Sequence, residues 1–240
     1  MTLPTATLSP LHRPDGSASY SASGYTIVGA VNGPLEVMRR DELPEEATLE
    51  VNIRPSAGVG TPKERHLETL LHTLLRRVLL VHSFPRTLIQ LTLQVTHTPE
   101  PGPLRYALNP HSVLPVLPVL LQTALLTLIA ASLPLATTYT TTTVAVLRDG
   151  TLVVPTEGTD LGGAKSLHVF VFAADGGLML VESEGGFDVE EWAEAKDVAQ
   201  QWCVRPEGDM EVEGAGQGRV WLEHVVRKKV ERESRWRVAA

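Results

Sequence analysis

The apolar residues between Leu67 and Val78 recur at intervals of three and four positions. This spacing puts them on one face of a helix, so the segment predicts an amphipathic α-helix whose apolar stripe packs on the core. Just before it, Leu49, Val51 and Ile53 alternate with polar residues. Alternation with a period of two predicts a strand with one buried face. The helical stripe consists of Leu67, Leu70, Leu71, Leu74, Leu75 and Val78.

The same criteria divide the rest of the chain. Asp149-Gly150 and Asp175-Gly176-Gly177 are turn sequences that join neighbouring strands into hairpins, and Asp188 is a typical helix N-cap. Strands are predicted at about Tyr25–Asn32, Thr48–Arg54, Thr87–Val95, Thr137–Leu147, Leu152–Val154, Ala164–Ala173 and Leu178–Glu184, and further helices at about Val116–Ser132, Val189–Val204 and from Arg219. This order of elements predicts an α/β fold, a mixed α+β sandwich, and not a strict βαβ alternation.

The segment from Ser112 to Leu147 contains no charged residue. Its first part, Val113–Leu135, is long enough to cross a bilayer as a helix. It contains three prolines, however, and lacks basic residues at both edges. A buried core helix followed by a buried strand explains the pattern equally well, and we favour that interpretation and expect no membrane contact.

Composition supports a folded, intracellular protein. Hydrophobic residues make up 43% of the 240 positions, which is enough for a substantial core. The single cysteine, Cys203, excludes an internal disulfide, and no basic-then-apolar leader opens the chain, so we expect the cytoplasm or nucleus. We divide the chain into a flexible N-terminal arm (1–10), one folded domain (11–204), a Gly-rich linker (205–218) and a basic C-terminal helix (219–240).

Charge is unevenly distributed along the chain. The net charge is -7, but the segment from Gln217 to the end has seven basic and three acidic residues, which leaves the remainder at -11. An acidic body with a basic tail predicts a separate partner for each surface, while a solvated helix face is the alternative. The tail also has an apolar side that can dock on the body or on a neighbour, formed by Val220, Trp221, Val225, Val226 and Val230.

Several short motifs, in the right order along the chain, resemble those of the RNase PH-like family. They extend over about residues 11 to 204, and those of the first half are similar to one branch, the ring subunits of the RNA exosome. The motifs are Arg13–Ala18 followed by Gly24, Thr26 and Gly33-Pro34; Ala47–Val51; Arg54-Pro55; Pro85–Thr87; Leu93–Val95; Leu121–Leu135; and Asp149–Thr156.

The resemblance implies the ribosomal protein S5 domain 2-like fold and a place in a hexameric ring that threads RNA toward a separate nuclease. It implies RNA, other RNase PH-like ring subunits and S1/KH cap subunits as partners, in the nucleus, nucleolus and cytoplasm. In this setting we expect the basic helix at 219–240 to dock within the ring and contribute more to assembly than to RNA affinity.

The residues that phosphorolysis requires are missing. Active relatives place Gly-Gly-Thr-Arg before the second buried helix, where this chain has Leu114–Leu117, and aliphatic side chains cannot hold an anion. Active relatives also carry two aspartates six positions apart; here Asp160 is followed by Ser166, or one register on by Leu167. Val154 replaces a further Asp-like residue. We therefore predict no enzymatic activity, catalytic residue, metal or cofactor; the alternative is an active phosphorolytic 3′–5′ exoribonuclease with a degenerate site.

RNA contacts in such a ring would be contacts to phosphate. Relatives direct the loop after the Arg-Pro strand toward the channel, which makes Arg54, Lys63 and Arg65 the candidates here; a solvated helix start is the alternative. The eight histidines show no zinc-ligand spacing. We interpret His168 as a hydrogen-bonded strand residue and Cys203 as a small core residue.

Overall fold

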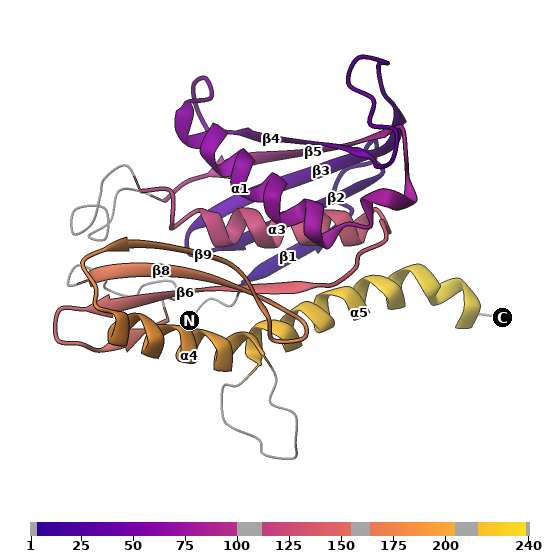
Figure 1. The fold of residues 1–240 in the computed structure, drawn as a ribbon. Coiled ribbons are helices and arrows are strands. Elements are labelled where there is room, and N and C mark those ends of the chain that lie inside the picture. Colours follow the sequence, from indigo (N-terminus) through magenta and orange to yellow (C-terminus); the bar gives the residue numbers. More distant parts are fainter. Residues whose placement is uncertain (1–3, 100–111, 155–163, 205–215, 239–240) are drawn as a thin grey trace.

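The computed structural model describes residues 4–99, 112–154, 164–204 and 216–238. Its first sheet has five strands in the order β1-β2-β3-β5-β4 (Figure 1). All neighbours are antiparallel except β4 and β5, which are parallel and connected through helix α1. The strands are β1 (Thr5–Leu8), β2 (Gly16–Ala22), β3 (Tyr25–Glu36), β4 (Thr48–Arg54) and β5 (Thr87–His97).

The second sheet has four antiparallel strands in the order β7-β6-β8-β9. Its central strand β8 is buried along nearly its whole length, since it has a strand on each side and packing on both faces. The predicted hairpin turns lie where expected, at Asp149-Gly150 and Asp175–Gly177. The strands are β6 (Tyr139–Leu147), β7 (Leu152–Val153), β8 (Ala164–Ala173) and β9 (Leu178–Gly185).

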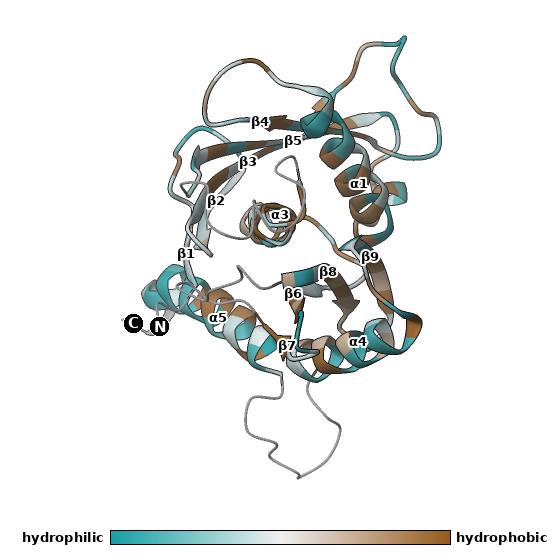
Figure 2. Cartoon of the chain, turned by 90° about the vertical axis from the view of Figure 1, so that its left-hand side faces the viewer, coloured by the Kyte–Doolittle hydropathy of each residue, from teal (hydrophilic) through white to brown (hydrophobic). Residues whose placement is uncertain are grey.

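Helix α3 (Leu117–Ala130) lies between the two sheets, as its end-on view in Figure 2 shows. It is buried all round, so the prediction of a core helix is confirmed, and no helix in the described part of the chain could span a membrane. The hydroxyls of Thr123 and Thr127 donate to carbonyls one turn back, which satisfies them inside the core. Gly29 of β3 lets the helix approach closely, because a Cβ there would overlap the Thr127 hydroxyl.

Helix α1 (Pro62–Val78) covers the same face of the first sheet next to β4. It begins with a capping box in which Thr61 and Glu64 satisfy each other's backbone groups. The predicted stripe is confirmed: five of its six residues are buried, and Leu70 is partly buried. A short 3₁₀ turn, η1 (Val81–Ser83), leads into β5.

Two helices cover the outer side of the second sheet. Helix α4 (Val189–Cys203) is capped by Asp188, as predicted, and packs on the outer faces of β6 and β8. Helix α5 (Gln217–Val238) confirms the predicted C-terminal helix, and it contacts α4, β6 and β1 (Figure 1).

The N-terminal region differs from the prediction. The expected flexible arm contains β1, which pairs with β2, and the sequence criteria missed both strands. Small and polar residues dominate these two strands, so their hydrophobic alternation is weak, and long-range pairing decides their structure. Most of the predicted Gly-rich linker lies outside the described residues.

Candidate functional site

The three candidate RNA-contacting residues surround one loop. Arg54 ends β4, residues 55–61 form the loop, and Lys63 and Arg65 lie in the first turn of α1. All three side chains are exposed. The three side chains thus lie at one end of the first sheet, and their role in RNA binding stays a prediction.

Arg54 and Arg65 share one hollow, whereas Lys63 lines its neighbour. The first, of about 480 Å³, lies between the end of β4, the loop and the start of α1. The second, of about 410 Å³, has Lys63 and Glu64 at one side. Its other walls include Val113 and Val116, next to the start of α3.

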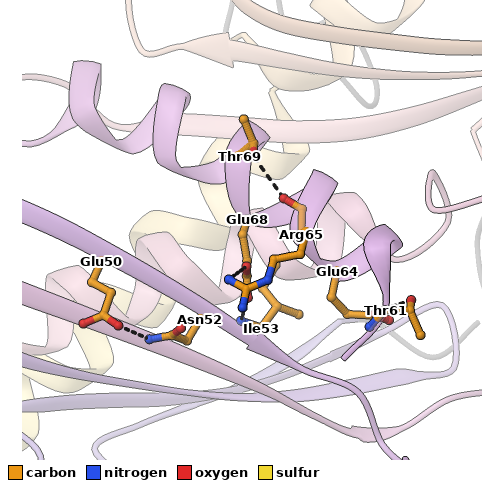
Figure 3. A network of polar contacts seen from close by, with 8 residues as sticks. All are labelled: Glu50, Asn52, Ile53, Thr61, Glu64, Arg65, Glu68 and Thr69. Atoms are coloured by element: carbon orange, nitrogen blue, oxygen red, sulfur yellow. Dashed lines mark hydrogen bonds and ion pairs between the residues drawn. The ribbon is translucent and has the colours of Figure 1, made fainter. Parts of the chain in front are cut away.

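Carboxylates on α1 modify this surface (Figure 3). Glu68 accepts the Ile53 N–H through Oε1 at 2.9 Å and pairs through Oε2 with Nη1 of Arg65 at 3.0 Å. One glutamate thereby covers an edge N–H of β4 and neutralises part of the charge on Arg65. Arg54, by contrast, has no ion pair or hydrogen bond of its guanidinium within the described residues. Of the two arginines, Arg54 is therefore the more available to phosphate.

Glu64 stays ionised at neutral pH. Partial burial would raise the pKa of its carboxyl, but hydrogen bonds from the Thr61 hydroxyl and backbone, together with the charge of Lys63, outweigh this and lower the pKa. The anionic Glu64 and Glu68 leave this end of the sheet only weakly positive. The sequence analysis did not identify Glu64 and Glu68 as charges that act on this surface. The i,i+3 spacing of Arg65 and Glu68 on a predicted helix could have indicated their ion pair.

Two amide side chains also line the first hollow, and the sequence analysis did not identify them. Asn52 and Gln94 contribute amides from β4 and β5. The Gln94 amide donates to the carbonyl of Pro55 at 2.9 Å, which ties the start of the loop to β5. No local pattern identifies these residues, because they reach the hollow only through the pairing of the two strands.

The position expected to bind phosphate is apolar in the structure. Leu114 and Leu117 are buried, and the N-cap of α3 is Val116, whose side chain makes no capping hydrogen bond. The backbone N–H groups of Val116 and Leu117 are directed to the carbonyl of Val113. The segment therefore contributes no side-chain donor or charge to hold an anion.

No carboxylate occupies the position of the second aspartate. Ser166 is buried, and its Oγ lies 2.9 Å from Nε2 of His168, whose Nδ1 lies 2.8 Å from Oγ of Ser183. The alternative register, Leu167, is a buried core residue. Asp160 lies outside the described residues.

The two residues interpreted as structural are confirmed as such. His168 is fully buried and hydrogen-bonded on both ring nitrogens; burial lowers its pKa, and the nearby Glu191 carboxylate only partly counteracts this. Cys203 is buried, and burial raises the pKa of its thiol to about 12. Within the described residues no cluster of metal-ligating side chains is found.

Comparison with known proteins gives consistent matches. The family described as "3′ exoribonuclease family, domain 1" (RNase PH) matches residues 5–139. Exosome complex component RRP46 of Saccharomyces cerevisiae is 26% identical over 196 residues, which cover 79% of this chain and 85% of the yeast protein. The crystal structure of rice (Oryza sativa) Rrp46 has a TM-score of 0.68 at 25% identity, with 81% of this chain and 86% of the rice chain covered. An Archaeoglobus fulgidus exosome with RNA bound to the active site shares the fold, at a TM-score of 0.63 and 13% identity over 82% of this chain and 84% of the archaeal one.

Proposed function

The chain belongs to the RNase PH family of 3′ exoribonucleases, and from this we propose that it is a non-catalytic, RRP46-like ring subunit of an RNA exosome. In this role it supports 3′–5′ RNA degradation and rRNA processing by a partner nuclease and helps to guide RNA through the ring channel. The partners we propose are other RNase PH-like subunits, S1/KH cap subunits and RNA, in the nucleus, nucleolus and cytoplasm.

The observation that carries the non-catalytic role is the Ser166–His168–Ser183 cluster. A hydroxyl bonded to a buried imidazole stands where phosphorolysis needs an ionised carboxylate. The hydroxyl carries no negative charge, and a buried neutral imidazole cannot replace the missing one. The apolar start of α3 supports the same conclusion independently, since it offers no side chain to inorganic phosphate.

A phosphorolysis assay tests the proposed lack of catalytic activity directly. The purified protein, alone and in its assembled ring without the partner nuclease, is incubated with labelled RNA, phosphate and magnesium, and release of nucleoside diphosphates is measured. We expect no phosphate-dependent shortening. Robust release that disappears in Asp160→Ala would show instead an active exoribonuclease with a degenerate site.

Ring membership is tested by its partners. A pull-down of the full chain followed by mass spectrometry should recover RNase PH-like subunits, and the chain should be most stable in such a heteromer. A well-folded monomer that ignores these subunits in size-exclusion chromatography would contradict ring membership.

The channel role is tested at the loop between β4 and α1. In the assembled ring, Arg54→Ala should weaken RNA crosslinking more than Arg65→Ala, because Glu68 already neutralises part of the charge on Arg65. Arg39→Ala is the control, because Arg39 is exposed and precedes the start of β4, whereas Arg54 ends that strand. Equal crosslinking in all three variants would show that this loop does not contact RNA in the ring.

A further inference from the structure

The hollow of about 480 Å³ at the end of β4 contains two amide side chains whose orientations are fixed. Nδ2 of Asn52 donates to Oε1 of Glu50 at 3.0 Å, as Figure 3 shows. Nε2 of Gln94 donates to the backbone carbonyls of Pro55 at 2.9 Å and Val95 at 3.0 Å. Because carboxylates and carbonyls only accept hydrogen bonds, each amide must turn its nitrogen toward them, and the flipped orientation is excluded.

The oxygens of both amides are therefore the atoms that remain for a ligand. Within the described residues, Oδ1 of Asn52 and Oε1 of Gln94 accept no hydrogen bond. Gln94 is the β5 partner of Arg54, and Asn52 lies two residues before Arg54 on β4. Residues two apart on a strand share a face, so the two amides and Arg54 lie together on the outer face of the first sheet. The hollow thus combines two uncharged acceptors with one cation.

The other polar side chains of the hollow add no uncharged donor for a ligand. The hydroxyl of Thr61 donates to the carboxylate of Glu64. Glu68 accepts a backbone N–H and pairs with Arg65 at 3.0 Å. The side-chain donors left are those of the two arginines, and only Arg54 is without an ion pair within the described residues. A complementary ligand therefore combines an anion for Arg54 with an amino group for the amide oxygens.

The loop between β4 and α1 gives the same hollow an apolar wall. Val59, between Gly58 and Gly60, lines the hollow and is 88% exposed. Pro55 at the start of the loop lines it as well. The flat face of a nucleobase placed against these side chains would remove apolar surface from water. Cation, acceptors and apolar wall correspond to the phosphate, the polar edge and the face of one nucleotide.

We propose that this hollow binds one nucleotide of single-stranded RNA and prefers a base with an exocyclic amino group, such as cytosine or adenine. The phosphate contacts Arg54, the base covers Val59, and the amino group donates to the oxygens of Asn52 and Gln94. Uracil has a carbonyl oxygen where cytosine has its amino group, and two acceptors facing each other form no hydrogen bond. This preference rests on the proposed function for the presence of RNA, and it adds the residues that discriminate between bases.

Fluorescence anisotropy with the full-length chain compares two labelled RNAs of equal length, one all cytidine and one all uridine, at neutral pH and the same salt. The two RNAs carry the same charge, so a difference in affinity reports the bases. The cytidine RNA should bind about 5-fold more tightly, which is the effect expected of one added hydrogen bond. A third RNA has 2-pyrimidinone in place of cytosine. It lacks only the amino group and should bind like the uridine RNA.

Variants of the chain separate the base contact from the phosphate contact. Asn52→Leu removes one acceptor at similar volume and should lose most of the cytidine preference while affinity for the uridine RNA stays. Arg54→Ala should weaken both RNAs by the same factor and lower the slope of log affinity against log salt by about 0.7. Gln201→Leu, at an exposed amide of α4, is the matched control and should change neither affinity. Melting temperatures check that each variant folds, and the 2-pyrimidinone RNA tests the amino contact without any change to the protein.

The outcomes distinguish the base preference from the proposed function. Equal affinity of the wild type for the cytidine and uridine RNAs would overturn the preference and leave RNA binding at this loop standing. A cytidine preference that persists undiminished in Asn52→Leu, or with the 2-pyrimidinone RNA, would overturn it too, because the amino group would not meet this amide. No binding of either RNA, or binding unchanged in Arg54→Ala, would contradict both the preference and the proposed RNA contact.

Discussion

The phenol hydroxyl of Tyr139 donates a 2.7 Å hydrogen bond to the backbone carbonyl of Leu121. Tyr139 begins β6 and Leu121 lies in the second turn of α3, so the bond joins the second sheet to the central helix. Both residues are buried, and burial raises the pKa of Tyr139 because no water solvates the phenolate. The hydroxyl therefore stays protonated, and remains a hydrogen-bond donor, at neutral pH.

Removing this hydroxyl should destabilise the protein modestly. We expect Tyr139→Phe to lower the free energy of unfolding by about 1 to 3 kcal/mol, because the Leu121 carbonyl is left buried without this donor. Tyr20→Phe is the matched control, since the Tyr20 hydroxyl makes no hydrogen bond within the part of the chain that the structure describes. Chemical denaturation measures both; equal losses would mean that the bond contributes nothing.

The centre of the α1 stripe should be sensitive to truncation. Leu74→Ala should cost about 2 to 5 kcal/mol, because it opens a cavity under a helix that packs on the first sheet. Leu80→Ala, at a residue just after α1 that is 44% exposed, should cost much less. An unchanged melting temperature for Leu74→Ala would show that α1 is not packed as described.

Two adjacent lysines of α5 should behave differently. Lys229→Met should lower the free energy of unfolding by about 1 to 3 kcal/mol, because it removes the hydrogen bond to the Ala130 carbonyl at the carboxyl end of α3. Lys228→Met changes an exposed residue and should alter stability by less than about 0.5 kcal/mol. The reverse order in thermal melts would mean that α5 docks through a different face.

Burial of His168 predicts a pH dependence of stability. Its pKa in the folded protein lies below the ordinary value of 6.5, so as the pH falls below 6.5 the unfolded chain takes up a proton that the folded chain resists. The contribution is fully present above this value and is lost as the pH falls through the folded pKa. The free energy of unfolding should therefore fall more steeply between pH 7 and pH 5 in the wild type than in His168→Gln.

The exposed His224 provides the control for that experiment. His224→Gln removes one exposed histidine and leaves the buried hydrogen bonds of His168 to Ser166 and Ser183 in place, so the comparison separates the effect of this buried imidazole from that of losing any histidine. Parallel slopes for the wild type and His168→Gln would show that His168 titrates as it does in the unfolded chain.

The sequence by itself determined the elements whose apolar pattern is strong. The stripe from Leu67 to Val78, the alternation at Thr48–Arg54 and the all-apolar run of α3 predicted their structures because each side chain's burial follows from local helical or strand periodicity. The resemblance to RNase PH-like proteins supplied the candidate loop and the positions at which catalytic residues were looked for. The Leu114–Leu117 segment could be judged unsuitable for an anion from side-chain chemistry alone.

Only the tertiary structure decided which groups meet. Pairing of β1 with β2 turned a polar N-terminal segment into sheet, and the packing of α1 on β4 brought Glu68 to the Ile53 N–H and to Arg65. The same holds for α5: its sequence showed an apolar side and a basic side, but docking on the body selected Lys229 for a buried contact and left Lys228 exposed. Which side chains meet depends on contacts between residues far apart in the chain. Local periodicity cannot predict these contacts, because it indicates only which side of an element is apolar.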